Sequence, residues 1–234
     1  MESLEISYLF KLSDNLSERF DVVLDAQTLE LQADQSMREA DWTRLEFHQC
    51  AHCPLNSDER AHCPVALSLA GVIKRLGNIC SHDDIELTVI TEERTVSGQT
   101  SAQRGISSLI GLLIATSGCP YTNFMKPMAR FHLPLSTEED TMYRAVGMYL
   151  IAQYFLRKEG EKEDLSLQGL TDIYKNLHTL NRSIAERIRF SAPGDASINA
   201  LVVLDMFTNL MPYAIEDHLD EIRYMFAPYL RQGE

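Results

Sequence analysis

The sequence lacks an apolar run of the roughly 18–20 residues that a bilayer-spanning helix requires. Its most apolar stretch, ISSLIGLLIATSG at 106–118, is shorter and is typical of a buried helix. The first residues, MESLEISYLFKL, also lack the basic segment and long apolar core of a secretory signal. Together these absences predict a cytoplasmic protein that makes no membrane contact.

Positive charge is scarce. The chain carries 21 Lys and Arg residues against 34 Asp and Glu, a formal net charge of −13. Such a chain repels phosphate backbones, and no basic stripe or aromatic–basic module counters the repulsion. We therefore expect no nucleic-acid partner, and we interpret the acidic surface as a means of keeping the protein soluble.

Glycine, proline and cysteine are also few, with 11, 8 and 5 residues among 234. The chain therefore has no low-complexity segment, and its 45% apolar content is enough for a substantial buried core. In a reducing compartment, five cysteines are expected to be thiols or metal ligands rather than disulfides.

The N-terminal half shows the two-residue alternation of half-buried strands. Residues 6–12 and 20–24 alternate apolar and polar side chains around a polar connection, and this predicts a hairpin. Residues 84–100 alternate and reverse in the same way, which predicts a second hairpin. Two further short strands are expected at 28–31 and 43–47.

Helical spacing of apolar residues appears first at 64–76, where Pro64 suits the first turn, and again at 105–117. From Ser136 onward the pattern is helical to the end of the chain. Ser136 and Glu139 have the spacing of a capping box for a helix that runs through Tyr154. Further helices are predicted at 166–190, 196–210 and 214–226.

These patterns predict an α+β fold. Antiparallel strands in hairpins with two central helices come first, and an all-α half follows. We divide the chain at 1–135 and 136–234 and expect the helical region to pack on the first as one globular unit.

The most unusual segment is HQCAHCPLNSDERAHCPVA at 48–66, in which AHCP occurs at 51–54 and again at 61–64. Cys50 and Cys53 have the C-x-x-C spacing at which two sulfurs can bind one metal ion. A tetrahedral site needs two more ligands, and Cys63 and Cys119 are the predicted third and fourth. The substitutes considered for the fourth ligand are His48, His62 and Cys80.

Cys63 directly precedes Pro64, so it is the predicted N-cap of the helix 64–76. Free N–H groups and the positive end of the helix dipole at that position favour a thiolate. Zinc is the first interpretation of the cluster, and an iron–sulfur cluster or other redox metal is an alternative. Reactive thiols without metal, and cysteines that are simply buried apolar side chains, also fit the pattern.

A second polar stretch, at 116–135, combines Cys119, Arg130 and His132. One interpretation is a cleft in which Cys119 is a nucleophile, His132 its base and Arg130 an anion-binding group. We favour the alternative that this stretch is a loop packed on the core, because closeness in sequence does not define a catalytic geometry.

The phrases HCPVALSL, SAQRGISSLIGLLIATSGCP and PMARFHLPLSTEEDTMYRAVGMYLIAQYF resemble a bacterial family catalogued only as a domain of unknown function. The HCPVA, TSGCP and ARFHLPL motifs carry the resemblance, and the matching phrases span roughly residues 46–156. The resemblance implies a small soluble bacterial protein and supplies no catalytic residues.

Three function classes are therefore open. The first is a metal-stabilised interaction or regulatory protein, whose partner would be another protein. The second is an enzyme that uses a metal or an iron–sulfur cluster, and the third is a thiol redox sensor without metal. The absence of a clear acid–base or nucleophile constellation favours the first. The sequence specifies neither a substrate nor an oligomeric state.

Overall fold

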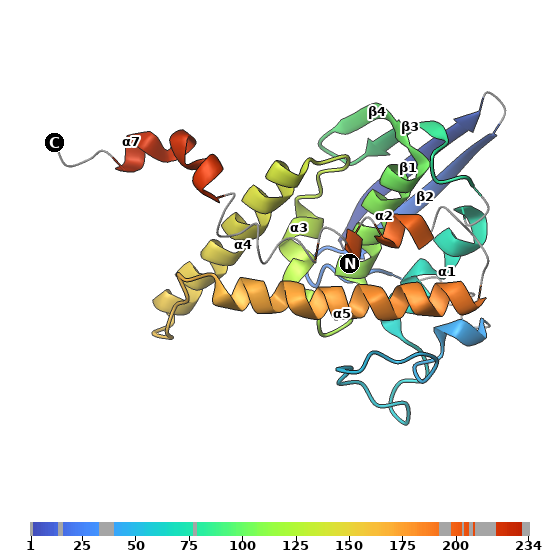
Figure 1. Ribbon diagram of the computed structural model, residues 1–234, viewed down its shortest axis with the longest axis horizontal. Helices are drawn as coiled ribbons and strands as arrows, with labels where there is room; N and C mark the ends of the chain where they lie inside the picture. The colour runs from blue at the N-terminus through green and yellow to red at the C-terminus, as the bar shows by residue number, and fades with distance from the viewer. Residues whose placement is uncertain are drawn as a thin grey trace.

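In the computed structural model, four antiparallel strands form one sheet in the order β2-β1-β3-β4 (Figure 1). The strands are β1 (Ser3–Ser13), β2 (Leu16–Asp25), β3 (Asp84–Ile90) and β4 (Thr95–Ser101). The structure describes residues 2–13, 16–32, 40–76, 79–191, 198–202, 204–205, 208 and 219–230. Both predicted hairpins are confirmed, and so is the α+β class.

The sheet buries one face because its apolar residues alternate. In β1, Ile6, Tyr8 and Phe10 are almost fully buried, and β3 contributes Ile85 and Leu87 to the same face. Central β1 is paired on both sides, with β2 and with β3. Successive side chains in a strand point to opposite faces, so this alternation places one apolar surface against the helices.

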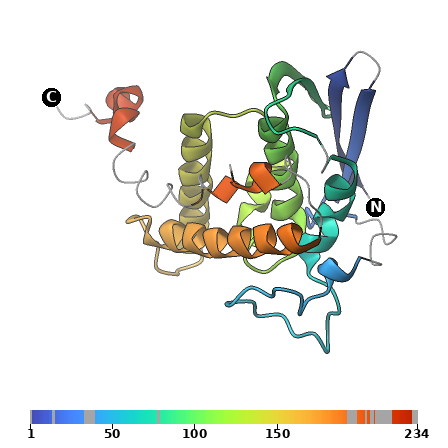
Figure 2. The same ribbon diagram turned by 45° about the vertical axis from the view of Figure 1, so that its right-hand side comes forward.

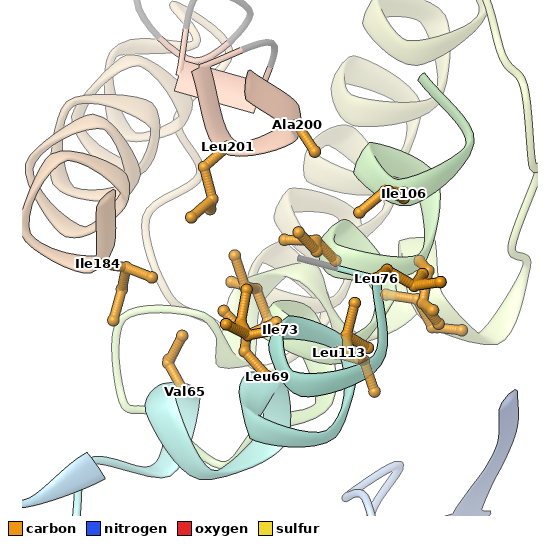
Figure 3. Close-up of a cluster of buried hydrophobic side chains, with 14 of the residues drawn as sticks. Val65, Leu69, Ile73, Leu76, Ile106, Leu113, Ile184, Ala200 and Leu201 are labelled. Atoms are coloured by element: carbon orange, nitrogen blue, oxygen red, sulfur yellow. The ribbon is translucent and has the colours of Figure 1, made fainter. Parts of the chain in front are cut away.

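Helices α1 (Pro64–Leu76) and α2 (Ala102–Thr116) cover that face. The α2 backbone lies very close to the sheet at Gly105, where an added Cβ would stand 2.9 Å from Cδ1 of Ile85. Figure 3 shows apolar residues of α1, α2, α5 (Gln168–Ser191) and the helical segment 198–202 meeting in one core. The labelled members are Val65, Leu69, Ile73, Leu76, Ile106, Leu113, Ile184, Ala200 and Leu201.

A second buried cluster lies between α4 (Glu138–Lys158) and the N-terminal half of α5. It contains Met142, Ala145, Val146, Tyr149, Leu167, Leu170, Tyr174, Leu177 and Ile222. The short helices η3 (Asn123–Met125) and α3 (Lys126–Arg130) connect α2 to this region, and Met125 packs against both clusters.

The α4 N-terminus differs by one residue from the prediction. Thr137, rather than Ser136, is the N-cap, and it forms a capping box with Asp140 rather than with Glu139. The Asp140 backbone N–H donates to the Thr137 hydroxyl at 3.1 Å, while the Asp140 carboxylate accepts from the Thr137 N–H at 2.9 Å. Aspartate serves at this position because its carboxylate also reaches the N-cap N–H.

The predicted strands at 28–31 and 43–47 are wrong. Leu31 forms one isolated bridge with Leu24, and Arg44 forms one with His62. The second segment begins as the short helix η2 (Asp41–Thr43). Its alternation is real, because Thr43 and Leu45 are buried while Arg44 is exposed, but no neighbouring strand among the described residues extends the single bridge into a ladder.

The described residues include only part of the two helices predicted near the C-terminus. In the range 196–210, residues 198–202, 204, 205 and 208 are helical. The helix predicted at 214–226 lies partly outside the described residues. Its end is misplaced, because η4 (Arg223–Phe226) is followed directly by α7 (Ala227–Leu230). Pro228 does not stop that helix because proline is tolerated in the first turn.

The C-terminal half of α5 packs into the sheet-side core through Leu180, Ile184 and Ile188. Its N-terminal half packs on α4, so one continuous helix belongs to both clusters. The predicted boundary between 1–135 and 136–234 therefore crosses a shared interior, and the division itself stays a prediction. Among the described residues, no helix combines the length and the apolar character needed to cross a membrane.

Candidate functional site

Four of the five cysteines surround one cavity. Cys50, Cys53, Cys63 and Cys119 line it. The other lining residues are Leu55, Pro64, Val65, Tyr121, Leu180 and Ile184. The cavity measures about 10 Å³, which is room for one guest the size of a single atom or water molecule.

Cys63 occupies the predicted position immediately before α1, which begins at Pro64. Its backbone N–H donates to the Thr43 carbonyl at 2.8 Å, which holds this end of the helix against η2. The backbone N–H groups of Val65 and Ala66 donate to its sulfur. These are unpaired donors of the first helical turn, so the helix start presents two hydrogen bonds to the sulfur.

Cys119 follows α2 after Gly118, whose φ of 80° turns the chain sharply. The backbone N–H of Tyr121 donates to the Cys119 sulfur. The turn is closed by the Thr122 N–H, which donates to the Cys119 carbonyl at 3.0 Å. Cys119 therefore resembles Cys63 in having a backbone donor aimed at its sulfur.

Cys50 and Cys53 form a tight turn in the loop before α1. The Cys53 N–H donates to the Cys50 carbonyl at 3.0 Å, and the Ser183 hydroxyl of α5 bonds the Cys50 sulfur. Leu180 and Ile184 of α5 close the same cavity. The four sulfurs thus come from the loop, the start of α1 and the turn after α2, with α5 as the opposite wall.

Three of the four cavity cysteines, Cys50, Cys63 and Cys119, have raised pKa values, which favours the neutral thiol when no cation is bound. Burial raises the pKa of Cys50, of Cys63 and of Cys119, the last to about 12. The neighbouring cysteines raise the pKa of each further, because like charges that close disfavour a thiolate. The predicted thiolate at Cys63 is therefore wrong for the free thiol, since desolvation outweighs the two N–H donors and the helix terminus.

Arg187 is the residue that sequence reasoning missed. It is 1% exposed, and its guanidinium donates to the carbonyls of Trp42, Arg44 and Leu45 at 3.1, 2.6 and 2.7 Å. Its charge also acts to lower the pKa of Cys50 and of Cys63. Its position three residues after Ile184, on the apolar face of α5, was the signal that it is buried.

The three substitute ligands lie elsewhere. His48 is exposed and stacks on Phe190 with ring centroids 4.3 Å apart, and Cys80 is also exposed. Nδ1 of His62 lies 2.8 Å from the Thr43 hydroxyl, so this histidine supports η2. None of the three lines the cavity. This placement favours Cys119 as the fourth member of the cluster.

His52, which the sequence did not single out, lies beside the cluster. Its ring packs on Tyr121 at 4.2 Å between centroids, and its Nε2 lies 3.2 Å from the Asn176 carbonyl. Its Nδ1 is buried and has no hydrogen-bond partner among the described residues. The first AHCP copy therefore uses its histidine to contact α5, whereas the second uses His62 to contact η2.

The cleft proposed for 116–135 is not assembled as a catalytic pair. Cys119 lines the cysteine cavity, whereas Arg130 and His132 line a different cavity beside β1. His132 Nε2 bonds the Tyr8 hydroxyl, which also lies 3.1 Å from the Ser108 hydroxyl. Burial, with the charges of Arg144 and Arg94, lowers the His132 pKa to about 3. It is a half-buried, neutral histidine that lines a different cavity from Cys119, so it is not the base of a Cys119 nucleophile.

The donor set fits a soft or borderline metal, because four thiols around an atom-sized space match the composition of an all-cysteine structural zinc site. As the side chains stand, however, no three His, Cys, Asp or Glu residues in the described ranges are arranged to hold an ion. The four cysteines therefore share a cavity without forming a finished coordination geometry.

Residues 6–227 match the family described as Domain of unknown function (DUF6901). The chain belongs to this family. The match spans nearly the whole chain, so the family's extent includes the cysteine cavity and all of the described helices except the end of α7. No curated protein and no solved structure matches the chain. The resemblance inferred from the sequence motifs to a domain of unknown function is confirmed, and it assigns no reaction.

Proposed function

We propose that Cys50, Cys53, Cys63 and Cys119 bind one zinc ion, and that this centre stabilises an interaction or regulatory protein. The observation that carries the proposal is that four cysteines from three separate segments line one atom-sized cavity. Only Cys80 lies apart, exposed on the surface. A bound Zn²⁺ would supply the positive charge that makes four neighbouring thiolates stable.

The surroundings suit thiolates once a cation is present. The N–H groups of Val65, Ala66 and Tyr121 already donate to the sulfurs, and hydrogen bonds to a charged form favour that form. Four thiolates and one Zn²⁺ carry a net charge of −2, and Arg187 brings a buried positive charge close to Cys50 and Cys63. Forming the site requires the side chains to turn inward and release their protons.

The centre would act as a cross-link. Residues 44–63 contain no described helix or strand, and such long irregular connections are uncommon in compact domains without a special role. Arg187 anchors the start of this loop through backbone carbonyls. A shared ion would anchor its middle and end to the turn after α2. Binding free energy at such a site becomes folding free energy.

Four cysteines are the ligand set of a structural zinc site, and an iron–sulfur cluster, which also takes four cysteines, is the alternative. The raised pKa of Cys50, Cys63 and Cys119 disfavours a metal-free thiol sensor, whose cysteines need low pKa and exposure. The centre suits the cytoplasm, where thiols stay reduced. The acidic charge makes a protein partner a better fit than nucleic acid or an anionic membrane.

Elemental analysis of the full chain, purified without a metal-binding tag, tests the proposal first. We expect one zinc per chain, no visible colour, and a visible ligand-field spectrum of tetrahedral thiolate coordination after replacement by Co²⁺. Iron with acid-labile sulfide and a brown colour would replace zinc with a cluster. Protein without metal that also fails to take up added Zn²⁺ would refute the centre.

Cys53→Ser and Cys80→Ser form a matched pair, because both remove one sulfur but only Cys53 lines the cavity. Cys53→Ser should lose zinc, and chelation should no longer shift its unfolding midpoint. Cys80→Ser should keep both properties of the original chain. Free zinc at 1,000 times Kd would stabilise the original chain by about 4 kcal/mol. Equal zinc loss in both variants would contradict the assignment.

A further inference from the structure

Helix α4 has a second apolar face that nothing in the described residues covers. Its buried face carries Met142, Ala145, Val146 and Tyr149, which pack on α5. Another stripe, at helical spacings of three and four, is exposed. It consists of Tyr143, Leu150, Ile151, Tyr154 and Phe155, and their exposed fractions run from 39% to 59%. We call these five residues the α4 stripe.

The C-terminal segment 223–230 is a second uncovered apolar surface. It comprises η4 and α7 and exposes Tyr224, Met225, Phe226, Tyr229 and Leu230, with Tyr229 at 79%. It begins directly after Ile222, which is buried in the α4–α5 cluster. Figures 1 and 2 both show α7 standing out from the body beyond α4. We call this segment the C-terminal hook.

The two surfaces match in extent. An aromatic side chain presents about 200 Å² and a buried aliphatic one somewhat less, so five half-exposed residues offer about 500 Å² on each surface. A single patch of about 500 Å² is at the upper range for a monomer. Two hooks on two stripes would remove up to about 2,000 Å² in total, which is the size of a stable interface.

Docking the surfaces would bury no carboxylate. Residues 143–155 and 223–230 contain no Asp or Glu, although the chain as a whole carries 34. Residues 143–155 contain one cation, Arg144, which is half-buried and donates to the carbonyls of Met128 and Phe131. Lys158 and Arg223, beyond the stripe and at the start of the hook, are exposed. The apolar centres therefore meet without the cost of an uncompensated buried charge.

We propose that a second copy of this chain covers the α4 stripe with its C-terminal hook, and that the exchange is reciprocal. Each copy then has one hook and one stripe, so two copies close a symmetric dimer in which both surfaces of each copy are covered. Within one copy the hook starts directly after Ile222, which is buried in the α4–α5 cluster, and α7 stands beyond α4 (Figures 1 and 2). The interface is independent of the cysteine centre.

The molar mass of the full chain in solution, followed by light scattering across a dilution series, tests the exchange. We expect a dimer at micromolar concentration. Ile151→Asp with Tyr154→Asp removes the stripe, and Phe226→Asp with Tyr229→Asp removes the hook. Each double variant should weaken association at least about 30-fold, the loss of one hot spot of 2 kcal/mol. Phe124→Asp is the control, because Phe124 is as exposed as Tyr154 but lies on η3.

Mixing the two double variants separates the exchange from other contacts. A chain with an intact hook and a chain with an intact stripe make one correct contact together and none alone. The mixture should therefore associate more tightly than either variant by itself, with unchanged far-ultraviolet circular dichroism for both. A stripe that pairs with another stripe would show no such rescue and would overturn the proposal. A monomeric original chain would overturn it too, whether its hook folds back or a different protein covers the stripe.

Discussion

Helices α2 and α4 are both rich in apolar residues, yet they are buried to very different extents. Eleven of the 15 residues of α2 are buried, in the core that α2 shares with the sheet, α1, α5 and the helical segment 198–202. Only five of the 21 residues of α4 are buried. A helix rich in apolar residues can therefore be enclosed in a core or leave many of them exposed, and the composition of the helix alone does not distinguish the two.

The difference has a cause in the neighbouring elements. Helix α2 follows β4 directly, so the chain lays it on the sheet, and Gly105 lets it approach closely. Helix α4 is separated from the sheet by η3, α3 and a turn, and its inner face packs on α5, on 219–222 and on Met125 and Met128 of these short helices. Position in the chain, rather than hydrophobicity, decides which helix is enclosed.

The largest expected difference between the two helices is in the cost of truncating a side chain. Leu109→Ala in α2, where the side chain is 0% exposed, should lower the free energy of unfolding by about 2–5 kcal/mol. Ile151→Ala in α4, at 59% exposure, should cost less than about 0.5 kcal/mol in dilute protein. Urea unfolding at two protein concentrations measures both. A cost for Ile151→Ala that grows with protein concentration would support the hook exchange. Equal costs for Leu109→Ala and Ile151→Ala in dilute protein would contradict the difference between the two helices.

Replacing one glycine in each helix by alanine should change the free energy of unfolding by a smaller amount, and in opposite directions. In Gly105→Ala the added methyl meets Ile85 at 2.9 Å and Phe10 at 3.3 Å, so we expect a loss of about 1–3 kcal/mol from overpacking. Nothing lies within 4 Å of a methyl added at Gly147 in α4, so Gly147→Ala should gain up to about 1 kcal/mol of helix propensity. Thermal melts of dilute protein would show one midpoint falling and the other rising. A gain at Gly105 would mean that α2 lies farther from the sheet.

Acid should act on the sheet side through His132. Its pKa in the folded protein is about 3, below the unfolded value of about 6.5, so the contribution to stability is present above pH 6.5. That contribution is lost as pH falls from about 6.5 towards 3, by up to about 1.4 kcal/mol per pH unit. His132→Gln should flatten the pH dependence of unfolding in this window, whereas His82→Gln, at an exposed position, should leave it unchanged. Equal slopes for His132→Gln and the original chain would show that His132 does not titrate on unfolding.

Much of the fold follows from local patterns. Period-two alternation placed the two hairpins, and the Cys63-Pro64 pair placed the start of α1, because strands and helix starts depend on nearby residues. The failures are segments whose outcome depends on a distant partner. Residues 43–47 alternate like a strand, but Arg187, more than 140 residues away in the chain, takes their carbonyls instead of a neighbouring strand.

The four cysteines that line one cavity had been named from the sequence, but their surroundings had not. Spacing pointed to Cys50 and Cys53, and Cys63 and Cys119 were the predicted third and fourth ligands. Leu180 and Ile184 of α5 line the cavity with the cysteines, and the sequence says nothing of which helix will lie over the cluster. Whether the cysteines bind metal stays a prediction.

Helix α5 has a practical consequence for any attempt to dissect this protein. It is 24 residues long, so it extends about 36 Å. A fragment ending at residue 135 would lack Leu180, Ile184 and Ile188. The apolar core residues of the sheet, α1 and α2 that pack with them would then be exposed to water. A fragment cut at the boundary between the strand-rich and helical regions should therefore aggregate. The smallest fragment worth expressing must include the whole of α5.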